Sequence, residues 1–170
     1  MSQELVFKTI LETLDQLIEV ENQLRRKESG FGFPKARITL VGQYGLLTHP
    51  DRPLKRLSLV ATLDVDAWID ASEFVKTEFK RLLADAGLEY DNDSEKVWIP
   101  KESTFTPIFS TLRLECEVLD PVYSLVSKAI KAKEKNRILV RDALSVYGNE
   151  LRDLINKHGG DCDYFEKRAS

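Results

Sequence analysis

The N-terminal section carries apolar residues at the spacing of an amphipathic helix. Between residues 3 and 27 they recur three or four positions apart, which places them on one helix face. Ser2 suits the N-cap position, and the glycines and proline of residues 30–34 end the pattern. We therefore predict a long helix from Gln3 to Lys27. Its apolar residues are Leu5, Val6, Ile10, Leu14, Leu17, Ile18 and Leu24.

Two runs of β-branched and other apolar residues follow. Ala36–Val41 predicts a buried strand, and Gly42 directly after it suits a tight turn into a helix. Residues 58–69 form a second apolar run, which contains Asp64 and Asp66. In a strand, these two side chains point to the same face of the sheet. Alternatively, the strand ends before them and both acids lie in a solvated turn.

The spacing of apolar residues in the middle of the chain predicts a helix followed by two strands. Residues 71–86 have helical spacing, and Gly87 suits the end of that helix. A brief strand is predicted at residues 97–99. Residues 108–119 alternate between apolar and polar side chains, which is typical of a strand. The polar face of this strand carries Arg113, Glu115 and Glu117.

The C-terminal section predicts two helices and a tail. Asp120 and Pro121 suit the N-cap and first residue of a helix that continues to about Lys135. A second helix is predicted from Arg137 to Lys157. Beyond it, we expect residues 159–170 to form a flexible tail.

These elements predict one α/β (α+β) domain over residues 1–170. A small mixed central sheet with its helices occupies residues 36–119. The N-terminal helix lies within residues 1–30, and the C-terminal helix pair occupies residues 120–158. A chain of 170 residues is long enough to bury one sizeable core.

Composition and charge narrow the function classes. The net charge of −3 and the pI of about 5.5 give no general affinity for nucleic acid or for an anionic membrane. No apolar run approaches the roughly 20 residues of a membrane helix, and no secretory signal is visible. Cys116 and Cys162 have neither metal-ligand spacing nor enough partners for a disulfide framework. We expect a reduced, cytoplasmic protein without a membrane partner.

Asp64 and Asp66 are the first candidates for chemistry. Two ionised carboxylates side by side repel each other and resist burial, and a bound divalent cation offsets both effects. The turn at Gly42 would let backbone N–H groups approach a phosphate. On a neighbouring strand, Glu115 or Glu117 would add a third carboxylate. These residues predict a site for Mg²⁺ (or Mn²⁺) and a phosphorylated ligand.

The order of these motifs resembles a known fold. Ile38-Thr39-Leu40-Val41-Gly42-Gln43, then Thr62-Leu63-Asp64-Val65-Asp66, and then the strand around Glu115 follow each other along the chain. The segment from Val118 to Ala129 continues the pattern. The series is similar to the nucleotidyltransferase fold of the DNA polymerase β superfamily, especially its small bacterial members related to AbiEii-type toxins and minimal nucleotidyltransferases. The resemblance covers roughly residues 37–143.

The resemblance implies a reaction and a role for each motif residue. It implies transfer of a nucleoside monophosphate from a nucleoside triphosphate to a hydroxyl of a protein or RNA acceptor. Asp64 and Asp66 would hold the metal ions together with Glu115 or Glu117, two acids that the sequence alone does not separate. Glu115 would also help to deprotonate the acceptor hydroxyl.

The same resemblance implies a role in ligand binding for three further residues. Gly42 and Gln43 would contact the β- and γ-phosphates, and Lys128 would neutralise phosphate charge. Gln43 stands where serine or a second glycine is usual, and the interval from Gln43 to Asp64 is longer than in compact members of the superfamily.

Two alternatives stay open, and those departures motivate the first of them. One is a catalytically degenerate protein of the same fold that acts as a partner-binding, toxin–antitoxin-like module, with a protein partner or as a homo-oligomer. The long amphipathic helices at both ends of the chain favour it. The other is a nucleic-acid binder that uses the basic residues between Lys128 and Arg141.

Overall fold

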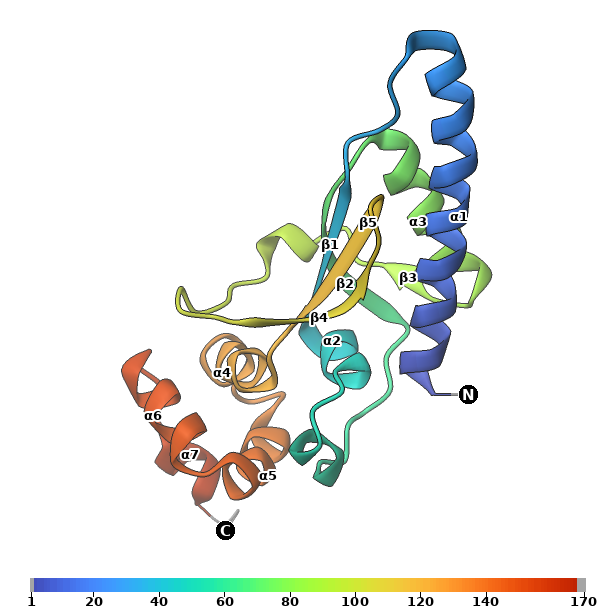
Figure 1. Ribbon diagram of the computed structural model, residues 1–170. Helices are drawn as coiled ribbons and strands as arrows, with labels where there is room; N and C mark the ends of the chain where they lie inside the picture. Colours follow the sequence, from blue (N-terminus) through green and yellow to red (C-terminus); the bar gives the residue numbers. More distant parts are fainter. Residues whose placement is uncertain (1, 168–170) are drawn as a thin grey trace.

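A five-stranded mixed sheet and seven α-helices make up the computed structural model, which describes residues 2–167 (Figure 1). The strands are β1 Ala36–Val41, β2 Asp64–Asp70, β3 Glu89–Tyr90, β4 Phe105–Ser110 and β5 Leu114–Leu119. The helices are α1 Gln3–Ser29, α2 Gly42–Thr48, α3 Glu73–Asp85, α4 Pro121–Lys131, α5 Arg137–Tyr147, α6 Asn149–Lys157 and α7 Cys162–Glu166. Two short 3-10 helices are η1 Pro53–Arg56 and η2 Ser94–Lys96. The α/β (α+β) class predicted from the sequence is confirmed.

The sheet has the strand order β3-β2-β1-β5-β4, with β1 at its centre. β1 runs antiparallel to β2 and parallel to β5, while β4 and β5 form an antiparallel hairpin. Because β1 is paired on both edges, its β-branched and aliphatic residues are in the most protected position of the sheet.

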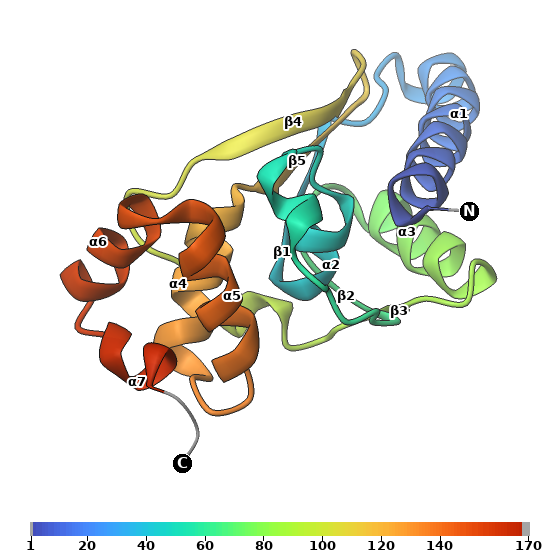
Figure 2. The same ribbon diagram turned by 90° about the horizontal axis from the view of Figure 1, so that it is seen from below.

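Helices α1 and α3 lie side by side on one face of the sheet (Figures 1 and 2). Phe7 of α1 forms the centre of this core, with edge-to-face contacts to Tyr44 and to Phe79 of α3. All three aromatic side chains are at most 1% exposed. Burial of aromatic surface of this size stabilises the contact between α1, α2 and α3.

The C-terminal helices enclose a second core at one end of the molecule (Figure 2). Leu125 of α4, Val140 of α5, Leu151 of α6 and Phe165 of α7 are all almost completely buried there. Helix α2 joins the two cores, because Tyr44 belongs to the first and Leu46 to the second. The position of α2 therefore fixes the C-terminal helices relative to the sheet.

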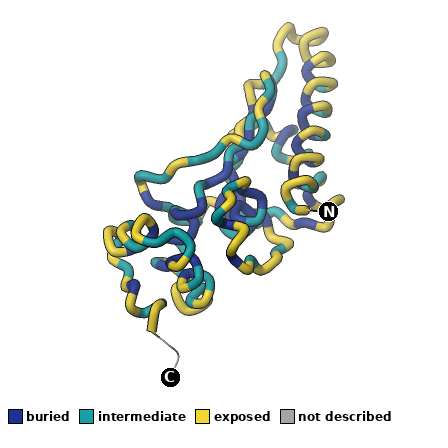
Figure 3. The backbone as a smooth tube through the Cα atoms, turned by 60° about the horizontal axis from the view of Figure 1, so that its bottom comes forward, coloured by how far each residue is buried: buried dark blue, intermediate teal, exposed yellow. Residues whose placement is uncertain are grey.

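The other face of the sheet is polar over much of its area. Along β2 the buried residues Val65 and Ala67 alternate with Asp64, Asp66 and Trp68, whose side chains share the open face. In Figure 3 the buried parts of the chain, in dark blue, form a band through the sheet and the inner sides of the helices. The open face is where the candidate site lies.

An ion pair at the end of the sheet ties α1 to the β4–β5 hairpin. Asp15 is only 8% exposed, and it accepts hydrogen bonds from Nε and from a terminal nitrogen of Arg113 at 3.1 and 3.0 Å. Thr111 donates a further bond to the same carboxylate at 2.8 Å. These three hydrogen bonds provide partners for both oxygen atoms of the largely buried carboxylate.

Several predicted elements agree with the structure. The N-terminal helix extends to Ser29, and Ser2 caps it by accepting a hydrogen bond from the backbone N–H of Leu5. The strand Ala36–Val41 and the turn at Gly42 into a helix are confirmed. Cys116 is buried, as expected for a residue on the apolar side of its strand.

Other predictions were wrong in their boundaries. The run at 58–69 becomes a strand only at Asp64, so the two acids begin β2. Residues 97–99 form no strand. The predicted strand at 108–119 is a hairpin, because Thr111, Leu112 and Arg113 turn the chain between β4 and β5. The hydrophobic pattern alone did not reveal this turn.

The C-terminal section also differs from the prediction. The first helix ends at Lys131, and the second is divided into α5 and α6 by Gly148, whose φ of +62° interrupts helical geometry. The tail contains α7, which packs Phe165 into the second core. Residues 168–170 of that predicted tail lie outside the described residues.

Among residues 2–167, none of the helices combines the length and the apolar composition needed to cross a membrane.

Candidate functional site

The candidate site begins where β1 turns into α2. Gly42, the first residue of α2, has a φ of +66°, a conformation that favours glycine. A Cβ atom at this position would lie 2.4 Å from Oδ2 of Asp66. The absence of a side chain therefore allows the backbone of Gly42 to contact the Asp66 carboxylate.

Asp64 and Asp66 occupy the start of β2. Asp66 pairs with Val41, so its carboxylate is beside the β1–α2 turn. Asp66 is half-buried, whereas Asp64 is exposed and its backbone N–H is held by the Thr62 hydroxyl at 3.1 Å. The sequence prediction that both acids share one face of a strand is confirmed.

A third carboxylate near this pair comes from Asp91, directly after β3. The backbone N–H of Asp91 donates to the carbonyl oxygen of Val65 at 2.9 Å, which places the residue beside β2. Burial, the charge of Asp91 and a hydrogen bond shared with its carboxyl raise the pKa of Asp66 to about 6. Lys128 opposes this rise, and the charge of Asp64 adds to it.

Lys128 of α4 faces Asp66 from the side of the C-terminal helices. Its side chain is half-buried, and burial together with the charge of Lys135 lowers its pKa, while the charge of Asp66 acts in the opposite direction. A lysine held in this way offers a partly desolvated cation whose attraction for an anion is stronger than at the open surface. Lys128 and Asp66 are therefore close enough to influence each other's protonation.

Two adjoining cavities open beside this group, and both contain Lys128, Lys135 and Asn136. The first, which we call the lysine groove, has a volume of about 450 Å³. It is lined by Gly42, Lys96, Val97, Trp98, Ser127, Lys128, Lys131, Ala132, Lys135 and Asn136. With four lysines and no carboxylate among its lining residues, the groove is suited to a polyanion.

The second cavity, which we call the loop cleft, has a volume of about 510 Å³. It lies between residues 58–62, α4 and α5, and is lined by Gln43, Ser58, Val60, Ala61, Thr62, Lys128, Lys135, Asn136, Ile138, Leu139 and Asp142. Gln43 donates from Nε2 to the carbonyl oxygen of Val60 at 2.9 Å. The Gln43 side chain thus holds the loop that forms one wall of the cleft.

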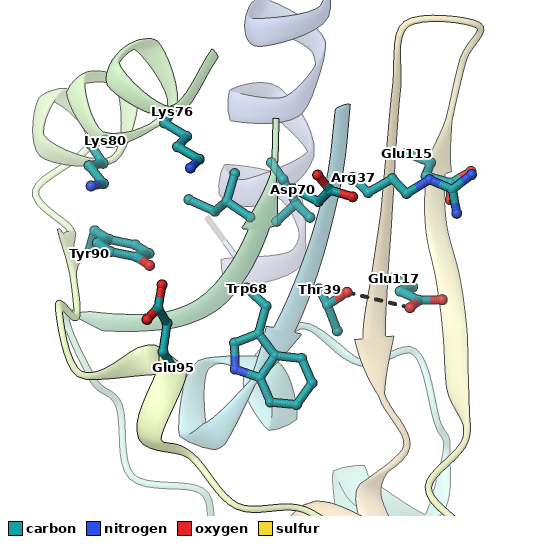
Figure 4. A pocket seen from close by; sticks show the side chains of 12 residues that line it. Arg37, Thr39, Trp68, Asp70, Lys76, Lys80, Tyr90, Glu95, Glu115 and Glu117 are labelled. Atoms are coloured by element: carbon teal, nitrogen blue, oxygen red, sulfur yellow. Dashed lines mark hydrogen bonds and ion pairs between the residues drawn. The ribbon is translucent and has the colours of Figure 1, made fainter. Parts of the chain in front are cut away.

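Glu115 and Glu117 lie elsewhere on the open face, in a cavity of about 580 Å³ that we call the sheet hollow (Figure 4). It is lined by Arg37, Ile38, Thr39, Trp68, Ile69, Asp70, Lys76, Lys80, Tyr90, Glu95, Glu115 and Glu117. Neither Asp64 nor Asp66 lines this hollow, so the three predicted acids do not share one cavity.

Strand register explains the separation. Glu115 is level with Arg37 on β1, whereas Asp66 is level with Val41, four residues further along. At about 3.3 Å per residue, this is roughly 13 Å along the strand direction. Glu117 is level with Thr39 and is nearer by two residues.

Each glutamate also has a partner in the hollow. Glu115 forms ion pairs with Lys35 at 3.0 Å and Arg37 at 3.3 Å, and a hydrogen bond from Lys35 together with the charges of both cations lowers its pKa. Glu117 accepts a hydrogen bond from the Thr39 hydroxyl at 3.4 Å. Glu115 is therefore held as one member of a surface ion-pair cluster, away from Asp64 and Asp66.

The carboxylates of Asp64 and Asp66 suit a magnesium ion that is already bound to phosphate better than they suit a free magnesium ion. Among residues 2–167, no three His, Cys, Asp or Glu side chains are placed to hold a metal together. Magnesium in proteins commonly uses one or two carboxylates plus substrate phosphates and water. Asp64 and Asp66, on one face of β2, are the residues that could provide such a smaller donor set.

The sequence singled out Lys128 and the basic residues up to Arg141, but neither Asp91 nor Lys96, which completes the lysine groove. Asp91 lies in an acidic turn, and only the pairing of the two-residue strand β3 with β2 brings it to Asp66. Lys96 comes from η2, far along the chain from the lysines of α4. The excess of lysine around α4 was the one signal in the sequence that could have suggested the groove.

Comparison of the chain with protein-family models, curated proteins and solved structures gives no match. The family resemblance of the sequence therefore stays a hypothesis.

Replacement of Gly42 by alanine should destabilise the protein more than the backbone conformation alone explains. Gly87 has a similar φ of +77° but nothing within 4 Å of its Cβ position, so it is the matched control. We expect Gly87→Ala to lower the free energy of unfolding by about 1 kcal/mol and Gly42→Ala by roughly 2–4 kcal/mol. Urea unfolding measures both, and equal losses would contradict a Gly42–Asp66 contact.

The raised pKa of Asp66 should make stability depend on pH. The folded protein keeps a proton on Asp66 that the unfolded chain releases between pH 3.8 and about 6. The free energy of unfolding therefore falls as pH rises through this window. Urea unfolding below and above this pH window measures the effect. We expect the fall in the free energy of unfolding to be smaller in Asp66→Asn than in the wild-type protein. In Asp64→Asn the fall should change much less. An unchanged pH profile in Asp66→Asn would show that Asp66 titrates normally.

Proposed function

We propose that the protein is a metal-dependent nucleotidyltransferase that transfers a nucleoside monophosphate from a nucleoside triphosphate to an acceptor hydroxyl and releases pyrophosphate. The observation that supports it most is the contact between Gly42 and Asp66, with Lys128 and the lysine groove beside it. It combines a carboxylate pair for a cation with a concentrated positive surface for phosphate.

The triphosphate would lie between α2 and α4. Lys128, Lys131 and Lys135 supply positive charge along one side of the lysine groove, and Gly42 lines its inner end. Gln43 lies next to Gly42 but already donates to Val60, so its main contribution is to hold the loop of the cleft. The half-buried Lys128 would contribute most, because its charge is the least screened by water.

Asp64 and Asp66 would hold Mg²⁺ or Mn²⁺ together with the phosphate oxygens. When bound, such an ion neutralises phosphate charge and lowers the pKa of a coordinated hydroxyl. Asp66 must be ionised to serve as a ligand, so its raised pKa predicts weaker binding of the metal–triphosphate below about pH 6. Asp91 would assist by adding negative charge beside Asp66.

The acceptor would approach from the sheet hollow. In phosphoryl transfer, the attacking and leaving oxygens are roughly in line on opposite sides of the phosphorus. The lysine groove lies on the α4 side of Asp66, and the sheet hollow begins at Trp68, two residues along β2. Of the two glutamates, Glu117 is nearer to Asp66 along the strand direction. It is therefore the better placed to accept the proton of a protein or RNA hydroxyl.

Nucleotide binding tests the proposal directly. Isothermal titration with ATP, CTP, GTP and UTP plus Mg²⁺ should detect binding of at least one triphosphate by the wild-type protein. Asp66→Asn and Lys128→Gln should each weaken it by about tenfold or more, since each removes a charged contact.

Glu115→Gln is the matched control, because the structure separates Glu115 from the phosphate side. It should change nucleotide affinity by less than about twofold. No magnesium-dependent binding of any of the four triphosphates by folded wild-type protein would contradict the proposal.

A partner-binding protein of the same fold is the second candidate. Helix α1 leaves Leu5, Val20 and Leu24 between 49% and 58% exposed, within an arc of one helix side. Such exposed apolar residues can be buried against a second copy of the chain. Under this candidate, light scattering finds a dimer for wild type and a monomer for Val20→Ser/Leu24→Ser. A monomeric wild-type protein would count against it.

A further inference from the structure

The walls of the loop cleft carry exposed apolar side chains on two facing segments. Val60, on the loop before β2, is 77% exposed, and Ile138, in the first turn of α5, is 65% exposed. Large aliphatic residues with this much exposure on both sides of a cavity provide surface for a flat apolar ligand. The cleft volume of about 510 Å³ is within the usual range for small-molecule sites.

Both walls are attached to the folded core. The loop is held at Val60 by Gln43 of α2, and its preceding residue Leu57 is buried in the second core. Leu139 and Val140, directly after Ile138, pack against the same core. The distance between the walls is therefore set by the fold, as a preformed site requires.

The polar lining of the cleft includes acceptor groups on Asn136 and Asp142 beside the donor groups of Lys128 and Lys135. Asn136 donates from Nδ2 to the carbonyl oxygen of Ala132 at 2.9 Å, which leaves its Oδ1 free to accept. Among residues 2–167, the Asp142 carboxylate pairs only with the neighbouring Arg141, at 3.3 Å. An ionised carboxylate only accepts hydrogen bonds. A ligand with an amino group at its edge would donate a hydrogen bond to the Asp142 carboxylate.

The cleft also has a cationic part, which it shares with the proposed phosphate site. Lys128 and Lys135 line both the loop cleft and the lysine groove. A ligand that spans the two cavities would have phosphate charge at the lysines and a flat amino-bearing ring between Val60 and Ile138. A nucleotide whose base has an exocyclic amino group combines these features.

We infer that the loop cleft binds the base of the nucleotide and selects bases with an exocyclic amino group (cytosine, adenine or guanine) against uracil. Val60 and Ile138 hold the ring, and the Asp142 carboxylate accepts a hydrogen bond from the amino group. This inference rests on the proposed function for the phosphate part of the site. It adds the class of nucleotide and the residues that determine specificity.

The test compares CTP, UTP and inorganic tripolyphosphate, each titrated calorimetrically in the presence of Mg²⁺. CTP has an amino group where UTP has a carbonyl oxygen, so the pair isolates the hydrogen bond to Asp142. We expect CTP to bind at least about tenfold more tightly than UTP, as for a site whose acceptors are otherwise unpaired. Tripolyphosphate should bind more weakly than CTP because it leaves the apolar walls empty.

Three variants separate the contributions. Ile138→Ser should weaken CTP binding by about tenfold and leave tripolyphosphate affinity unchanged. Asp142→Ala should reduce the difference between CTP and UTP to less than about threefold. Leu112→Ser is the control, because Leu112 is 91% exposed on the β4–β5 turn, and it should change none of the affinities.

The outcomes distinguish this inference from the proposed function. Failure of tripolyphosphate and of every nucleotide to bind would contradict the proposed function itself. Tripolyphosphate binding with equal affinities for CTP and UTP would leave the phosphate site intact and overturn the base selection. Unchanged CTP affinity in Ile138→Ser would show that the base lies outside the loop cleft.

Discussion

The close contact between the Gly42 backbone and the Asp66 carboxylate is the constraint on which the rest of the site depends. It requires a residue without a side chain in a left-handed conformation, at the point where β1 becomes α2. Any Cβ at this position would displace the carboxylate or the turn. Because β1 is the central strand, such a displacement would be transmitted to both neighbouring strands.

Helix α2 extends this constraint to the whole molecule. The helix is short, so only a few of its side chains pack against the rest of the protein. Of these, Tyr44 packs in the first core and Leu46 in the second. The C-terminal helices are thereby held beside the sheet, and Lys128 comes to face Asp66. The lysines lie on the α4 side and the carboxylates of Asp64 and Asp66 on the sheet side, and the proposed metal-bound triphosphate would lie between them.

Local patterns in the sequence were sufficient for the elements that depend on nearby residues. The cap at Ser2, the strand from Ala36 and the glycine turn at Gly42 follow from side-chain chemistry over a few positions. The positions of Asp91 and Glu115 depend instead on strand register, which a single sequence does not contain. Gly148 was overlooked because helical periodicity continues on both sides of it.

The most direct measurement is a backbone amide NMR titration with Mg²⁺ and tripolyphosphate. If the β1–α2 turn, the start of β2 and α4 form one phosphate site, the largest shift changes occur at Gly42, Asp66 and Lys128. The amides of Arg37 and Glu115, in the sheet hollow, then change little. Largest changes in the sheet hollow, or none anywhere, would contradict a phosphate site built around Gly42 and Asp66.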